Sequence, residues 1–156
     1  MQKISTCLWL ENQAEEAAEF YVSVLGVSRI LDVSRFDEGG PGQAGQVITV
    51  EFEIEDRKFM ALNGGAPANF TEAVSFVVDC SDQEEVDRYW SALTVGGAES
   101  QCGWLKDRYG VSWQVVPDVL GSLIGGPDPE GAQRAMQAML GMQKLDIAVL
   151  QTAYDG

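Results

Sequence analysis

The sequence contains no histidine, and this absence excludes several classes of site. Serine and cysteine nucleophiles that are activated by an imidazole base cannot form, because the base is missing. Metal centres that depend on imidazole ligands are excluded for the same reason.

Basic side chains are also scarce: 10 Lys and Arg stand against 24 Asp and Glu, which gives a formal net charge of −14. Nucleic acid and anionic membranes both attract basic surfaces, so we expect neither as a partner. No apolar run approaches the roughly 20 residues that span a bilayer. The segment 1–6 has no apolar stretch after Lys3, and we therefore expect no signal peptide.

Cysteine is limited to Cys7, Cys80 and Cys102, with no C-x-x-C spacing. An odd number of widely separated cysteines predicts reduced thiols in a cytoplasmic protein and not a disulfide framework or a zinc site. The length of 156 residues fits one domain with an ordinary hydrophobic core.

One order of predicted elements occurs twice along the chain. In the first half, the apolar spacing predicts a strand over 4–10, a helix over 14–25, and strands over 29–36, 47–54 and 57–62. In the second half it predicts a strand over 73–78, a helix over 82–93, and extended segments over 99–105 and 111–116. The segments 15–21 and 84–90 align at an offset of 69 residues, which favours an internal duplication. A Gly/Pro-rich link and helices over 131–140 and 144–153 follow.

Several segments together carry a resemblance to a known family: 7–10 with 13–21, 59–65, 75–80, 102–114, 134–140 and 144–147. With these segments the chain resembles the PhnB-like branch of the vicinal oxygen chelate superfamily, also labelled 3-demethylubiquinone 3-methyltransferase-like. The resemblance implies an α+β, glyoxalase-like fold, in which two βαβββ modules form a cleft of curved mixed sheets. Residues 1–116 would form one domain with modules at about 1–65 and 70–116, and 117–156 a C-terminal helical extension. It also implies a homodimer.

The resemblance also locates the positions where metal-dependent members of the superfamily carry His or Glu ligands. They fall at Ser5 or Thr6, within 57–62, within 73–75 and at Gln114, and none of them holds a His or Glu. A divalent cation needs several anionic or carbonyl oxygens to replace its hydration shell. We therefore expect no metal and no other cofactor.

Methyl transfer, which the family label suggests, is disfavoured by the pattern of glycines. A Rossmann-type methyltransferase would lead from a strand through a glycine-rich turn into a helix. The glycines at 39–42 precede a strand, and those at 64–65 are followed by another strand. We therefore treat the label as a family name only.

The residues expected to line the cleft are Cys7, Trp9, Asn63, Cys102, Trp104, Ser112 and Gln114. For two of these residues a purely structural role is the alternative: Cys102 would be a buried small hydrophobic residue, and Asn63 would form a turn. The leading hypothesis is metal-independent binding of a small apolar or aromatic molecule. Two other functions stay open: an enzyme that acts on a quinone-like, thiol-reactive or oxo-acid substrate through Cys102 or a carboxylate, and a non-catalytic structural or regulatory dimer.

Overall fold

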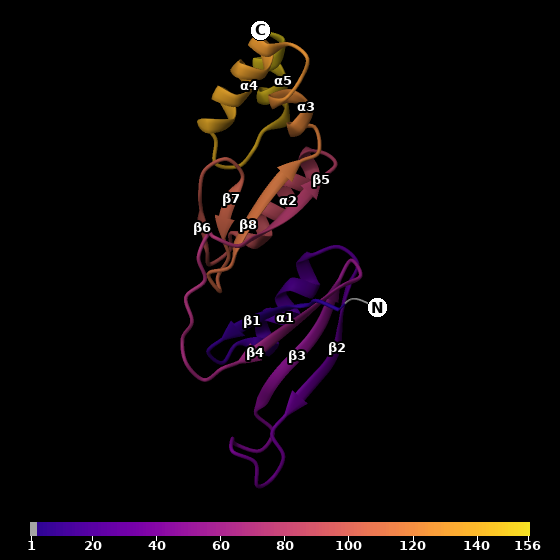
Figure 1. The fold of residues 1–156 in the computed structure, drawn as a ribbon, viewed down its shortest axis with the longest axis vertical. Helices are drawn as coiled ribbons and strands as arrows, with labels where there is room; N and C mark the ends of the chain where they lie inside the picture. Colours follow the sequence, from indigo (N-terminus) through magenta and orange to yellow (C-terminus); the bar gives the residue numbers. More distant parts are fainter. Residues whose placement is uncertain (1–2) are drawn as a thin grey trace. The chain divides into compact units, whose positions relative to one another are not determined.

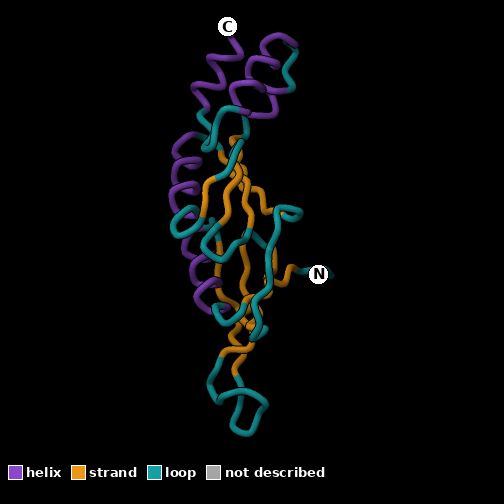
Figure 2. The backbone as a smooth tube through the Cα atoms, turned by 90° about the vertical axis from the view of Figure 1, so that its left-hand side faces the viewer, coloured by secondary structure: helices purple, strands orange, loops and turns teal. Residues whose placement is uncertain are grey.

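The computed structural model describes residues 3–156, which fold into two compact units with the boundary between Asn69 and Phe70 (Figure 1). Each unit contains a four-stranded mixed sheet with a helix along one face (Figure 2). The predicted α+β fold of two βαβββ modules is therefore confirmed. Within the described residues, no helix combines the length and apolarity needed to cross a membrane.

The first unit consists of β1 (Thr6–Leu10), α1 (Ala14–Val24), β2 (Ser28–Arg35), β3 (Val47–Ile54) and β4 (Arg57–Asn63). Its strands lie in the order β1-β4-β3-β2, with β1 parallel to β4 and the other pairs antiparallel. The helix buries its alanines and Tyr21 against the sheet, and the Tyr21 ring stacks on Phe52 at 6.2 Å. The loop between β2 and β3 extends beyond the strands (Figure 2).

The second unit repeats this arrangement with β5 (Ser75–Cys80), α2 (Gln83–Leu93), β6 (Ala98–Glu99), β7 (Trp104–Lys106) and β8 (Ser112–Pro117). The strand order is β5-β8-β7-β6, and only β5 and β8 are parallel. The helix begins after Asp82, whose carboxylate accepts the Glu85 N–H as an N-cap does.

The predicted extended segment over 99–105 is wrong in its middle, where the chain turns between β6 and β7. Cys102 and Gly103 have φ values of 58° and 84°, a left-handed conformation that a strand cannot contain. A Cβ on Gly103 would lie 2.7 Å from the Val115 carbonyl oxygen and 3.1 Å from Leu145 Cδ1. Glycine is therefore required at 103 for space as well as for conformation.

The C-terminal region holds three helices, α3 (Leu120–Ile124), α4 (Pro129–Leu140) and α5 (Ile147–Asp155). The first of them lies in the segment that the sequence predicted to be a link. The starts of the other two are set by capping carboxylates, since Asp128 accepts the Glu130 N–H and Asp146 accepts the Val149 N–H. Their shared core consists of Leu120, Leu123, Ala135, Leu145 and Leu150, and Met139 and Met142 pack against it.

The segment between α4 and α5 is bound to the β6–β7 turn and to α2. Cys102 and Gly103 donate their N–H groups to the Met142 and Gln143 carbonyls at 2.8 and 2.7 Å. The Gln83 side chain donates to the Leu145 carbonyl at 3.2 Å and accepts the Ile147 N–H at 2.8 Å. This segment therefore fixes the turn at Cys102 from outside the sheet.

Candidate functional site

Strand alternation divides each sheet into a face that packs on its helix and an opposite face, here called the open face. In the second unit, Leu105, Trp113 and Val115 are buried in the core. Because neighbouring side chains alternate, Trp104 and Gln114 lie on the open face, where the strand register pairs them. The adjacent pair, Lys106 and Ser112, shares that face.

A hollow of about 530 Å³ lies on the open face of the second unit and is here called the β7 hollow. It is lined by Glu72, Ala98, Glu99, Ser100, Gln101, Cys102, Trp104, Leu105, Lys106 and Ser112. Three of the predicted cleft residues, Cys102, Trp104 and Ser112, are thus brought together within one unit. The volume is within the range of small-molecule sites, about 300–1,000 Å³.

Next to the β7 hollow, Gln114 Nε2 donates a hydrogen bond to Ser75 Oγ at 2.9 Å. These are two of the positions where the family resemblance places metal ligands in other members. Here they form a neutral amide–hydroxyl pair, and the amide nitrogen that is turned toward Ser75 cannot coordinate a cation.

Ser112 is the buried polar side chain of the β7 hollow. It is only 1% exposed, and its Oγ has no hydrogen-bond partner in the described part of the chain. Buried hydroxyls normally find a partner, because leaving one unpaired costs about 1–3 kcal/mol. The Ser112 hydroxyl is therefore an unsatisfied polar group in a residue that lines the hollow.

The charged groups of the β7 hollow are engaged within the protein. Lys106 Nζ contacts Glu72 Oε1 at 2.6 Å, and this hydrogen bond holds the pKa of Glu72 below its ordinary value. Glu99 Oε1 accepts the indole N–H of Trp90 at 2.8 Å. Sequence reasoning missed Glu72 and Lys106, because no local pattern indicates a contact between a loop residue and the end of a distant strand.

The three cysteines have different environments. Cys7 is exposed, Cys102 is partly buried in the wall of the β7 hollow, and Cys80 is fully buried. Burial, reinforced by the nearby carboxylates of Glu85 and Asp118, raises the pKa of Cys80 to about 12. Cys80 therefore stays a neutral thiol in the folded protein at physiological pH.

In the first unit, Cys7 and Trp9 lie on the open face of their sheet, opposite the buried Leu8 and Leu10. Trp9 is 44% exposed, and its indole donates to the Ala66 carbonyl at 2.9 Å. The predicted position within 57–62 that corresponds to Gln114 is an apolar side chain, Met60. Met60 lies three residues before Asn63, which forms the last pair between β1 and β4. Gln114 likewise lies three residues before Pro117, which forms the last pair between β5 and β8.

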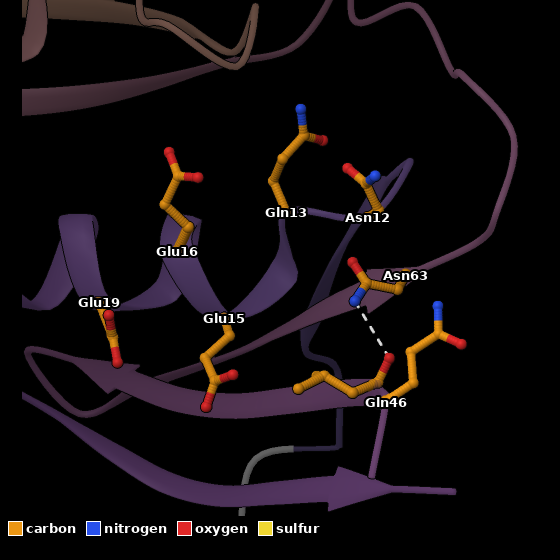
Figure 3. Close-up of a pocket in the computed structure, with 8 residues that line it drawn as sticks. Asn12, Gln13, Glu15, Glu16, Glu19, Gln46 and Asn63 are labelled. Carbon is orange, nitrogen blue, oxygen red and sulfur yellow. Dashed lines mark hydrogen bonds between the residues drawn. The ribbon is translucent and has the colours of Figure 1, made fainter. Parts of the chain in front are cut away.

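Asn63 holds the start of α1 in place. Its Oδ1 accepts the Ala14 N–H at 2.8 Å. Its Nδ2 donates to the Val47 carbonyl at 3.1 Å, the hydrogen bond that is dashed in Figure 3. It borders a separate hollow of about 410 Å³, which is otherwise lined by Asn12, Gln13, Glu15, Glu16, Glu19, Gln46 and Val47. The amide satisfies a helix end, so its structural role in this unit is clear.

The residues at the superfamily's ligand positions do not fit a metal ion. In the second unit these residues are Ser75 and Gln114, which pair with each other. In the first unit Thr6 lies on the helix-packing side, with Leu8. The alternative, Ser5, offers only a neutral hydroxyl, and Met60 offers only a thioether. Among residues 3–156, no group of three or more acidic or thiol side chains is placed to hold a metal.

Comparison with known proteins places these observations in a family. The model of the 3-demethylubiquinone-9 3-methyltransferase family matches residues 2–116. No curated protein matches the chain. Among solved structures, a PhnB protein from Bacillus cereus, described as a candidate 3-demethylubiquinone-9 3-methyltransferase, is 40% identical with a TM-score of 0.68. The match covers 74% of this chain and 99% of that protein.

Two further structures share the fold at lower identity. Protein PA1353 from Pseudomonas aeruginosa is 20% identical with a TM-score of 0.61, over 75% of this chain and 98% of its own. The fosfomycin resistance protein FosX from Mesorhizobium loti is 14% identical with a TM-score of 0.53, over 74% and 92% of the two chains. The chain therefore belongs to the 3-demethylubiquinone-9 3-methyltransferase (PhnB-like) family.

Proposed function

We propose that the protein binds a small, largely apolar or aromatic molecule without the help of a metal ion. The observation that carries the proposal is the hydrogen bond from Gln114 to Ser75 at positions where other members of the superfamily hold metal ligands. A neutral amide and a hydroxyl that satisfy each other supply none of the anionic oxygens that a hard cation requires.

The β7 hollow supports the apolar character of the ligand. Trp104 provides a large aromatic surface, and Ala98 and Leu105 add apolar contacts. Aromatic walls with a few placed polar groups are typical of small-molecule sites, because burial of apolar surface supplies affinity and the polar groups supply orientation.

Methyl transfer is not part of the proposal, although the family's name refers to it. A methyl-donor site of the Rossmann type needs a glycine-rich turn between a strand and the following helix. The corresponding turns here, at residues 11–13 before α1 and 81–82 before α2, contain no glycine. Their side chains would block the close approach of a cofactor to the backbone.

The protein is further proposed to be a cytoplasmic homodimer. The open faces of the two sheets carry exposed apolar side chains, Trp9 at 44% and Val77 at 54%, which a second copy could cover. Light scattering after size-exclusion chromatography at two protein concentrations tests the dimer. A mass of one chain at both concentrations would overturn it.

Thermal unfolding, followed by intrinsic tryptophan fluorescence, tests the proposed function. We expect small aromatic and quinone-like compounds to raise the Tm of metal-free protein, because a ligand that binds only the folded state stabilises it. We expect Mg²⁺, Mn²⁺, Ni²⁺ and Zn²⁺ to leave the Tm unchanged. If a metal raises the Tm of the wild type but not of the Gln114→Ala variant, metal independence is overturned. If no compound in the panel raises the Tm, ligand binding is overturned.

A further inference from the structure

We infer that the hydroxyl of Ser112 is the polar anchor of the β7 hollow and that its ligand is an uncharged ring compound with a hydrogen-bonding group. This inference deepens the proposed function and rests on it. It assigns the ligand a chemical class and assigns one residue the role of selecting it.

The Ser112 hydroxyl lies between two side chains that already have hydrogen-bond or ionic partners. Its register partners across the sheet are Ser75 and Lys106, and each of these side chains is already engaged, by Gln114 and by Glu72. The Ser112 Oγ itself has no partner among the described residues, although the side chain is 99% buried. A hydroxyl in this position stabilises the protein only when something outside the chain completes its hydrogen bond.

The Ser112 side chain is on the side of the sheet that faces the β7 hollow. Trp113, the next residue along β8, is buried in the core on the helix side of the sheet. Alternation therefore puts the Ser112 side chain on the open face, where it lines the β7 hollow together with Trp104. A ring that lies against Trp104 would bring its substituent toward Ser112.

The charged side chains around the hollow are Glu72, Glu99 and Lys106. Lys106 and Glu72 neutralise each other, so an anionic ligand would lose its hydration without gaining an unpaired cation. A cationic ligand would have to compete with the Trp90 indole N–H for Glu99. An anion would also approach a chain of net charge −14. An uncharged ligand with a carbonyl or hydroxyl group avoids these costs.

Four probes that share one ring test this assignment: toluene, benzamide, benzoate and benzylamine. Their binding to isotope-labelled protein is measured by the chemical-shift changes of the Ser112 amide and the Trp104 indole. We expect benzamide to bind most tightly. In the Ser112→Ala variant, its Kd should increase about tenfold, which corresponds to one hydrogen bond of about 1.4 kcal/mol. The Kd of toluene should change less than twofold, since it makes no hydrogen bond.

Stability measurements show whether Ser112→Ala acts through folding. The variant removes an unpaired buried hydroxyl, so we expect a Tm equal to that of the wild type or higher. Ser122→Ala serves as the matched control, because that exposed hydroxyl bonds to the Val119 carbonyl of its own turn and does not line the hollow. It should leave benzamide binding unchanged.

Each outcome decides the inference. Tenfold weaker benzamide binding in Ser112→Ala, with an unchanged or raised Tm, supports it. Equal benzamide binding in both proteins overturns the role of Ser112 and leaves the proposed function standing. Tighter binding of benzoate or benzylamine than of benzamide overturns the uncharged class. If none of the four probes changes a chemical shift up to its solubility limit, the inference is overturned. If, in addition, no aromatic or quinone-like compound raises the Tm, the proposed function is overturned as well.

Discussion

The indole Nε1 of Trp113 donates a hydrogen bond to Asp107 Oδ2 at 2.9 Å, and both residues are buried. The other carboxylate oxygen, Oδ1, accepts the backbone N–H groups of Tyr109 and Val111 at 2.8 and 3.1 Å. Asp107 thus fixes both the turn between β7 and β8 and the side chain of Trp113, which precedes Gln114 in β8. This turn determines how the two strands present Lys106 and Ser112 to the hollow.

Replacement of Asp107 is expected to destabilise the second unit strongly. Asp107→Ala leaves the Trp113 indole and the Tyr109 and Val111 N–H groups without their acceptor, and we expect a loss of roughly 3 kcal/mol in the free energy of unfolding. Urea denaturation followed by fluorescence measures it. Glu84→Ala, at an exposed carboxylate on α2, should change stability by less than about 0.5 kcal/mol. Similar losses in the two variants would contradict the prediction.

Two glycines with the same backbone conformation should respond differently to alanine. Gly103 and Gly110 have φ values of 84° and 85°, but only at Gly103 would an added Cβ meet other atoms within 4 Å, among them the Val115 carbonyl oxygen. Gly110→Ala should cost about 1 kcal/mol for the left-handed conformation alone. Gly103→Ala should cost at least about 1 kcal/mol more, because the β6–β7 turn must move. Equal losses in the free energy of unfolding, measured by urea denaturation, would show that the β6–β7 turn accommodates the added methyl group without strain.

The pair Gln114 and Ser75 should be energetically coupled. In a double-mutant cycle of Gln114→Ala and Ser75→Ala, we expect a coupling free energy of about 0.5–1.5 kcal/mol, the usual contribution of one neutral hydrogen bond. Chemical denaturation of the four proteins gives this value. Additive effects would mean that the hydrogen bond at 2.9 Å does not persist in solution.

Loss of Gln83 is expected to loosen the β6–β7 turn from a distance. In Gln83→Ala, the hydrogen bonds to the Leu145 carbonyl and from the Ile147 N–H disappear. Hydrogen exchange should therefore accelerate at the amides of Cys102 and Gly103, which bond to the same segment. The control is Gln151→Ala, which removes only a contact within α5. Unchanged exchange at Cys102 would show that the segment is held by its apolar core alone.

The buried thiol of Cys80 predicts a loss of stability at high pH. The pKa of Cys80 is raised to about 12 in the folded state, so the folded protein keeps this proton between pH 9 and 12 while the unfolded chain releases it. Stability should therefore fall as the pH rises through this window, by at most about 1.4 kcal/mol per pH unit for this group. Comparison of urea denaturation in the wild type and Cys80→Ala isolates the contribution, and identical slopes would contradict it.

Thiol labelling gives a second and independent check on the same environments. We expect Cys7 to react first with a disulfide reagent, Cys102 more slowly because it is partly buried, and Cys80 only on unfolding. Single-cysteine variants followed by mass spectrometry assign each rate. Reaction of Cys102 ahead of Cys7 at neutral pH would indicate an activated thiol and would favour the enzymatic alternative.

The fold could be predicted from the sequence because its information is local and repeated. Phe52, buried between Glu51 and Glu53, shows the alternation of a strand with one face on a core, and the helices of both units keep their apolar spacing. The capping residues Asp82 and Asp128 fix helix starts through contacts only two or three residues away. Such signals survive without any knowledge of tertiary contacts.

The site was less accessible to sequence reasoning, because its defining features depend on long-range contacts. The left-handed turn at Cys102 bonds to the chain near Met142, and nothing in the neighbouring residues indicates this contact. The Glu72–Lys106 contact likewise joins segments that have no shared pattern. Strand alternation did place Ser112 and Gln114 on one face. The register pairs Gln114 with Val77, however, and only the side-chain hydrogen bond shows that Gln114 reaches Ser75.

The backbone bonds from Cys102 and Gly103 to Met142 and Gln143 have a consequence for how such proteins diverge. The family model ends at residue 116, so one wall of the hollow is held by a segment that lies outside the shared domain. Changes in the length or sequence of this appended region can reshape the hollow while every shared residue stays the same. The shape of the hollow in this chain therefore depends on the C-terminal region as well as on the duplicated core.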